Sequence, residues 1–170
     1  MKKIKYITVA VLLLLATVFS LASCGGKYHV NGLHYTLGKD FEHIKVTYSE
    51  NCYYDGNAYF YFNVYSHEGI EESLGFDGDI TVEDYTKKFC ALNGLPVVYE
   101  YDPERDRTII KCHARDFSLG SEPVIEEEFY YFTIFRGTAH LYIVTMSAPD
   151  EMREKYEPMF DGLVRDIYAD

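Results

Sequence analysis

Few residues of this sequence could carry out covalent chemistry. Cys112-His113 places a thiol next to an imidazole base, the combination that activates a cysteine nucleophile. Both residues fall in an expected strand, where successive side chains point to opposite faces, so the two cannot pair. The sequence also holds no G-x-S-x-G, H-E-x-x-H, P-loop or G-x-G-x-x-G motif. We therefore expect a protein that is not an enzyme.

Two groups of side chains offer metal ligands. One is a set of carboxylates before and within the start of an expected helix, namely Asp77, Asp79, Glu83 and Asp84. Ca²⁺ takes several carboxylate and carbonyl oxygens, but this spacing is not that of an EF-hand, and the helix dipole alone favours acids there. The other is a set of histidines that fits no standard zinc spacing, namely His29, His34 and His43. We expect no cofactor, and Ca²⁺ held by Asp77, Asp79 and Glu83 is the alternative.

Tyrosine is the unusual residue of the composition, with 17 Tyr beside 11 Phe and no Trp. In segment 59–65, strand alternation puts the phenylalanines on one face and the tyrosines on the other. Tyrosine offers apolar area with a polar hydroxyl, which suits protein and glycan surfaces. The candidate binding face consists of Tyr59, Tyr61, Tyr65, Tyr99 and Tyr101. The alternative is that these side chains fill a two-sided core with their hydroxyls at its rim.

The first half of the expected domain places these residues on strands and one helix. Strands are expected at 33–37, 44–48 and 59–65, followed by a loop rich in glycine and acid at 66–80. Thr81 then caps a helix that ends at Gly94. One apolar face of that helix is formed by Val82, Tyr85, Thr86 and Phe89.

Two hairpins and a final helix complete the chain. The first hairpin pairs 97–101 with 107–113, the second pairs 128–135 with 140–146, and a loop at 114–125 lies between them. Residues 147–150 open the last helix, and Pro158 inside it predicts a kink or two short helices. Parallel β-α-β units are missing. We therefore expect an α+β fold with a mostly antiparallel sheet of about six strands and two amphipathic helices packed on it.

The N-terminal segment is typical of an exported protein. Three lysines precede an apolar run of 16 residues from Ile7 to Ala22, which is shorter than the ~20 residues of a membrane span. Leu21-Ala22-Ser23-Cys24 resembles the bacterial lipobox, which implies diacylglyceryl transfer to Cys24 and cleavage before it. The alternative is an uncleaved membrane helix. We expect a signal peptide at 1–23, a lipidated tether at 24–29 and one domain at 30–170.

Three cysteines remain after Cys24, namely Cys52, Cys90 and Cys112. An odd number outside the cell allows at most one internal disulfide, and the sequence does not choose between three buried thiols and one bridge. Without a C-x-x-C motif, neither a thiol redox site nor a cysteine-rich zinc site is expected.

The net charge of the chain argues against negatively charged partners. The whole chain has a net charge of −11, and without the three lysines of the leader 13 basic residues face 27 acidic ones, a net charge of −14. Such a charge argues against binding to nucleic acid or to an anionic bilayer by electrostatics.

The arrangement of elements resembles the PsbP/Mog1-like superfamily, and within it the bacterial lipoproteins that resemble DcrB. The resemblance is carried by NGLHYTLGKDFE at 31–42, TVEDYTKKF at 81–89, the paired hairpins, and LYIVTMSAPDEMREKYEPMFDGLVRDIY at 141–168. It implies the α+β fold given above and a role that is generally not enzymatic, in assembly or in binding a partner. It carries no catalytic motif.

These observations predict a non-catalytic lipoprotein that binds a protein partner in envelope assembly or maintenance. It would lie outside the cytoplasm, anchored by the lipid on Cys24 to the cell membrane, or be periplasmic or on the outer membrane of a cell with two membranes. The partner would be an unknown envelope protein or glycan. The alternative is a lipoprotein that binds a small ligand or a divalent cation through the loops at 66–80 and 114–125.

Overall fold

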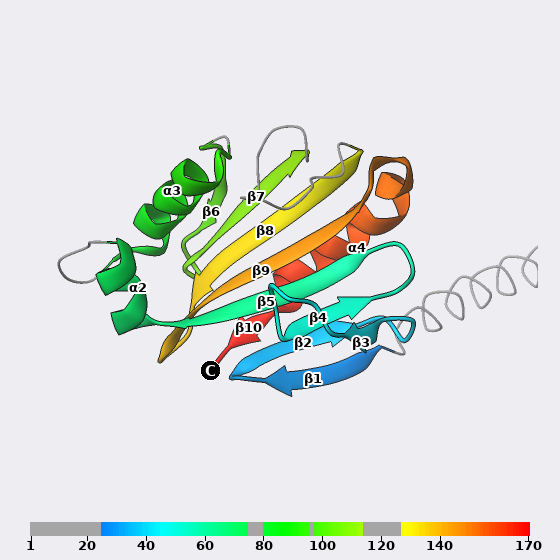
Figure 1. The fold of residues 1–170 in the computed structure, drawn as a ribbon, viewed down its shortest axis with the longest axis horizontal. Helices are drawn as coiled ribbons and strands as arrows, with labels where there is room; N and C mark the ends of the chain where they lie inside the picture. The colour runs from blue at the N-terminus through cyan, green and yellow to red at the C-terminus, as the bar shows by residue number, and fades with distance from the viewer. Residues whose placement is uncertain (1–24, 75–79, 96, 114–126) are drawn as a thin grey trace, which may run out of the picture.

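Ten strands form two antiparallel sheets in the computed structural model, which describes residues 25–74, 80–95, 97–113 and 127–170 (Figure 1). The larger sheet has seven strands in the spatial order β3-β4-β5-β9-β8-β7-β6, and the smaller has the order β1-β2-β10. The strands are β1 (Gly26–Val30), β2 (Leu33–Leu37), β3 (Glu42–Ile44), β4 (Asn51–Tyr54), β5 (Tyr59–Ser66), β6 (Glu100–Asp102), β7 (Arg107–His113), β8 (Glu128–Arg136), β9 (His140–Pro149) and β10 (Tyr168–Ala169).

Three α-helices and a 3₁₀ turn accompany these sheets in the described part of the chain. They are α2 (His67–Leu74), α3 (Val82–Asn93), the 3₁₀ turn η2 (Asp150–Met152) and α4 (Arg153–Asp166). No helix among the described residues is both long enough and apolar enough to cross a membrane.

The larger sheet has a core on each face, because the side chains of its strands alternate. The first core holds Phe60 and Phe62 of β5, which are fully buried together with Tyr131 of β8. Helix α4 packs there through Phe160, and the smaller sheet packs there through Tyr35. Figure 1 shows the smaller sheet beside the β3–β5 side of the larger one.

The second core lies on the opposite face and is built by α3. Phe132 and Ile134 of β8 and Ile110 of β7 pack there against Val82 of α3, while Ile70 of α2 joins the same cluster. Because α3 lies over β7 and β8, its cover is concentrated on that side of the sheet (Figure 1). Strand β8 is consequently buried on both faces from Glu128 to Phe135.

The expected start and end of α3 are confirmed. The Thr81 hydroxyl accepts a hydrogen bond from the Asp84 backbone N–H at 3.1 Å, which satisfies a donor at the helix N-terminus. Gly94 ends the helix at φ 66°, a left-handed conformation that favours glycine, and its N–H donates to the Cys90 carbonyl. Val82, Tyr85 and Thr86 are buried as their spacing predicted.

Arg107 of β7 links the larger sheet to the end of α4. Arg107 is 3% exposed, and its guanidinium donates to the carbonyl oxygens of Val164 and Ile167 at the end of α4, the latter at 2.9 Å. A cation near the last carbonyls of a helix is favoured by the helix dipole. The guanidinium also lies over the ring of Phe135 at 5.3 Å from its centroid.

The predicted α+β class and the antiparallel sheet are confirmed, while several boundaries differ. Residues 26–29, which we expected to belong to the tether, form most of β1 and pair with β2. The loop expected at 66–80 contains α2, whose Ile70 finds an apolar contact in the second core that the sequence pattern does not reveal. β4 and β10 were not predicted.

The last helix begins later than expected. Ser147 to Pro149 continue β9, because they pair with Glu128 to Tyr130 of β8, and η2 then leads into α4. Pro158 lies inside α4, which runs through it as one helix instead of two short ones.

Candidate functional site

Strand β5 presents tyrosines on the face that carries the second core. Its neighbour β4 adds Tyr54, which pairs with Tyr59 and stacks on it with ring centroids 4.4 Å apart. The rings of Tyr48 and Tyr61 form a T-shaped pair with their centroids 5.2 Å apart. We call this group the tyrosine surface: Tyr48, Tyr54, Tyr59, Tyr61 and Tyr65.

The tyrosine surface is partly exposed and uncharged. Tyr48 and Tyr65 are 43% and 39% exposed, and Tyr54, Tyr59 and Tyr61 are half-buried. Burial raises the pKa of Tyr59, with a smaller contribution from Tyr54, and burial also raises the pKa of Tyr65. Both hydroxyls therefore remain neutral at physiological pH and can donate or accept hydrogen bonds. Aromatic faces beside neutral hydroxyls can contact apolar and polar groups of a partner together.

The structure separates the other two predicted tyrosines from this surface. Strands β9, β8 and β7 lie between β5 and β6, and α3 covers β7 and β8. Near β6, the Tyr99 hydroxyl donates to Glu83 of α3 at 2.9 Å, and the Tyr101 hydroxyl donates to Asp106 at 3.0 Å. The predicted face is thus two groups of tyrosines on opposite sides of α3.

The predicted acidic cation ligands are engaged in other ways or lie outside the described residues. Glu83 accepts the hydrogen bond from Tyr99, and Asp84 pairs with Thr81 and Lys87. Asp77 and Asp79 lie outside the described residues, as does Cys24.

The histidines predicted as a loose group separate in the structure. His29 and His34 are cross-strand partners of β1 and β2, and both rings contact the carboxylate of Asp170. His43 lies apart on β3, where its Nε2 meets the Glu50 carbonyl oxygen. Sequence reasoning missed Asp170, because 136 residues separate it from His34 and only the pairing of β10 with β2 brings them together.

Cys112 and His113 point to opposite faces, as predicted. Cys112 is buried in the second core. His113 lies on the other face, with its Nδ1 2.9 Å from Asp150 and its Nε2 3.1 Å from Arg153. The thiol and the imidazole therefore form no nucleophile–base pair.

All three cysteines of the domain are buried and none is in a disulfide, so the bridged alternative is not formed. Burial raises the pKa of the Cys52 thiol to about 11 and also raises the pKa of the Cys90 thiol. The thiolate is the reactive form of cysteine. Burial therefore keeps these two thiols unreactive in two ways, by excluding reagents and by keeping the thiol protonated.

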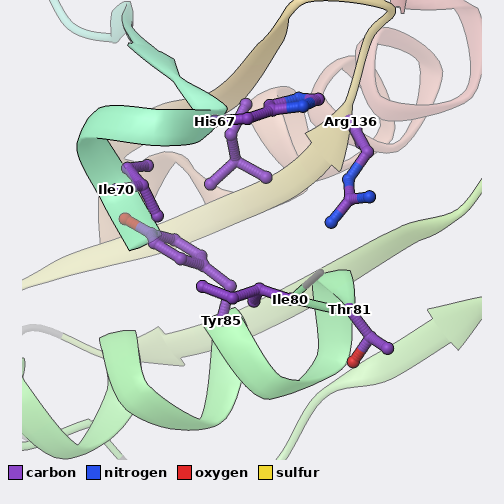
Figure 2. A pocket seen from close by; sticks show the side chains of 7 residues that line it. His67, Ile70, Ile80, Thr81, Tyr85 and Arg136 are labelled. Carbon is purple, nitrogen blue, oxygen red and sulfur yellow. The ribbon is translucent and has the colours of Figure 1, made fainter. Parts of the chain in front are cut away.

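The loop at 114–125 and residues 75–79, where a small ligand was expected, lie outside the described residues, but hollows occur elsewhere. Between α2, α3 and the end of β8, His67 and Arg136 face a cavity of about 10 Å³, room for one water molecule (Figure 2). A hollow of about 300 Å³ near the end of α4 is lined in part by Arg105, Arg107 and Arg165. Arg105 pairs with Asp102 and Arg107 caps α4, so two of these arginines already serve the fold.

Solved structures share this architecture at low sequence identity, while no family model and no curated protein matches the chain. Cyanobacterial PsbP (CyanoP) from Synechocystis sp. PCC 6803 superposes with a TM-score of 0.55 at 12% identity, covering 89% of this chain and 99% of that one. The Saccharomyces cerevisiae Ran-binding protein Mog1p gives a TM-score of 0.48 at 8% identity, covering 85% and 95%. The chain therefore has the α+β fold of PsbP, as its sequence resemblance implied.

Proposed function

We propose that this chain is a DcrB-like lipoprotein, anchored outside the cytoplasm through Cys24, that binds an envelope protein without catalysing a reaction. The observation that carries the proposal is the tyrosine surface. It leaves neutral aromatic side chains partly exposed on a sheet whose other face is packed under α4 and the smaller sheet.

The chemistry of this surface indicates the kind of partner. Tyrosines lose little conformational entropy on binding and combine apolar area with hydrogen bonding. The net charge of −14 outside the leader disfavours an acidic partner and nucleic acid. We therefore propose a protein partner with a neutral or basic contact region.

The length of the tether supports a site of action close to the membrane. β1 begins at Gly26, so only Gly25 separates a lipidated Cys24 from the folded domain. One residue spans about 3.6 Å at most. The partner would then be reached at the membrane surface, and exchange of Cys24 for Ala would release the domain or stall its processing.

Paired substitutions on intact membranes test the proposal. Tyr59→Ser with Tyr61→Ser should reduce crosslinking to the partner while the chain stays folded, because both side chains are only half-buried. Tyr101→Ser is the matched control, since Tyr101 is exposed on the far side of α3. Unchanged crosslinking in the double variant would contradict the proposal. Collapse of the fold would instead assign these tyrosines to the core.

A further inference from the structure

We propose that His29, His34 and Asp170 form a binding site for a divalent ion of the late first-row transition metals, such as Zn²⁺. These three residues lie on β1, on β2 and directly after β10. The site is separate from the tyrosine surface and does not depend on the function proposed above.

The β1–β2 hairpin fixes the two histidines side by side. Asn31 and Gly32 form its turn with φ values of 52° and 78°, and Val30 pairs with Leu33 next to the turn. The pair that closes a two-residue turn exchanges both backbone hydrogen bonds, so the following pair, His29 and His34, is a non-hydrogen-bonded pair. Side chains approach closest in such pairs, and the two imidazole centroids are 4.0 Å apart.

Backbone hydrogen bonds hold Asp170 beside this hairpin. Its N–H donates to the Gly32 carbonyl at 3.0 Å, and its carbonyl accepts from Thr138 at 2.7 Å. The side chain then reaches both rings, with 2.8 Å from one carboxylate oxygen to the His34 Nε2 and 3.2 Å from the other to the His29 Nε2. The β1–β2 hairpin and the residue after β10, which are far apart in the sequence, thus bring their ligand atoms together.

The spacing of the donor atoms suits a tetrahedral ion. The three donor atoms lie within 4.8 Å of one another. In a tetrahedral zinc site with bonds near 2.1 Å, the ligand atoms are about 3.4 Å apart. The separations of 2.8 and 3.2 Å run from two different oxygens of the Asp170 carboxylate to the two imidazoles, so a small rotation brings one oxygen and both nitrogens to this spacing. The side chains are open to solvent, which leaves a fourth position for water.

One ring must rotate when the ion binds. The two imidazole planes are 13° apart, and because each lone pair lies in its ring plane, stacked rings cannot both aim at one ion. The terminal torsion of histidine is soft, so such a rotation is accessible. His34 is also stacked on Tyr168 at 4.4 Å, whereas His29 is the more exposed of the two. We therefore assign the rotation to His29.

The ligand set selects the class of metal. Imidazole suits Zn²⁺, Ni²⁺ and Cu²⁺, whereas Ca²⁺ takes six or more oxygen ligands and Mg²⁺ prefers an oxygen octahedron. An aspartate side chain is ionised at neutral pH, so Asp170 offers a charged oxygen ligand beside the two imidazoles.

Zinc titration of the full chain tests the site, with the protein purified in detergent through a tag that contains no histidine. We expect one Zn²⁺ per chain, with Ca²⁺ unable to compete at the same concentration. His29→Ala, His34→Ala and Asp170→Asn should each weaken binding by about tenfold or more. His43→Ala is the matched control and should bind as the parent does. No saturable binding, or equal binding by all four variants, would overturn the proposal.

Imidazole nitrogen NMR of the unsubstituted chain keeps the test decisive if a variant fails to fold. Among the six histidines of the sequence, only His29 and His34 should shift strongly on adding Zn²⁺. Shifts confined to other histidines would place the ion elsewhere and contradict the site.

Discussion

The two sides of β5 differ both in their side-chain types and in how completely other elements bury them. Phe60 and Phe62 are completely buried, whereas Tyr59 and Tyr61 on the opposite side are half-buried and Tyr65 is 39% exposed. The phenylalanine side is packed by α4 and the smaller sheet. On the tyrosine side, α3 packs on β7 and β8 rather than on β5. A single strand therefore both builds the core and carries the proposed binding surface.

This difference shows how the choice between Phe and Tyr at a strand position relates to the degree of burial there. A Phe side chain has no polar atom to satisfy, so complete burial is favourable. A Tyr hydroxyl needs a partner or water, which favours positions at the edge of cover. Several tyrosines are nevertheless buried, and in the first core the Tyr35 hydroxyl has a partner because it donates to the Tyr53 hydroxyl at 2.8 Å.

The largest expected effect comes from the phenylalanine side. Phe60→Ala should lower the free energy of unfolding by about 3–5 kcal/mol, because it opens a cavity in the first core. Tyr61→Ala should cost less than half as much, since part of that side chain is already in water. Urea denaturation measures both. Equal losses would mean that the two sides of β5 are buried alike and would remove the comparison.

A smaller loss is expected on replacing Arg107, a buried cation that donates hydrogen bonds to the end of α4. Arg107→Met keeps much of the apolar stem but removes the hydrogen bonds to Val164 and Ile167. Hydrogen bonds to a charged group contribute about 1.5–3 kcal/mol, so we expect a loss in that range by urea denaturation. Arg105→Met is the control, because Arg105 is exposed and should have little effect. An unchanged free energy of unfolding in Arg107→Met would show that the end of α4 needs no cation.

Thiol labelling asks how well the tyrosine side is covered. Cys52 pairs with Tyr61 on that face, yet it is completely buried and its thiol pKa is raised to about 11. We expect Cys52, Cys90 and Cys112 to react with a thiol reagent at pH 8 only after denaturant is added. Rapid labelling of Cys52 in the folded chain would mean that the side chains of the tyrosine surface move apart and let the reagent reach the Cys52 thiol.

The smallest effect concerns acid at the rim of the first core. Hydrogen bonds from Arg153, then from Tyr131, hold the pKa of Glu157 below its usual 4.5. Because the pKa is lower in the folded state, its contribution to stability is present above about pH 4.5 and is lost as the pH falls through the folded value. Thermal melts between pH 7 and 3 should show a shallower acid dependence for Glu157→Gln. Identical slopes would contradict this assignment.

Local patterns predicted the elements that rest on local chemistry. The Thr81 cap and the alternation along β5 each depend on neighbours in the sequence, and both appear in the structure. The confirmed α+β class follows from their order.

Features that depend on distant contacts were not predictable. α2 is only eight residues long and contains Gly69, so its stability depends on packing that the pattern does not show. Tyr99 and Tyr101 were grouped with the β5 tyrosines because the sequence does not give the strand order. The pairing of Asp170 with His34 likewise requires knowing that β10 joins β2.

Site-specific photo-crosslinking on intact membranes tests the central claim most directly. A photoreactive residue is placed at Tyr65 or at Tyr101, which are 39% and 41% exposed but lie on opposite sides of α3. The account predicts a discrete crosslinked protein from position 65 and none from position 101. Equal crosslinking at both positions, or crosslinking only from 101, would contradict the proposal that the tyrosine surface on β5 binds the partner.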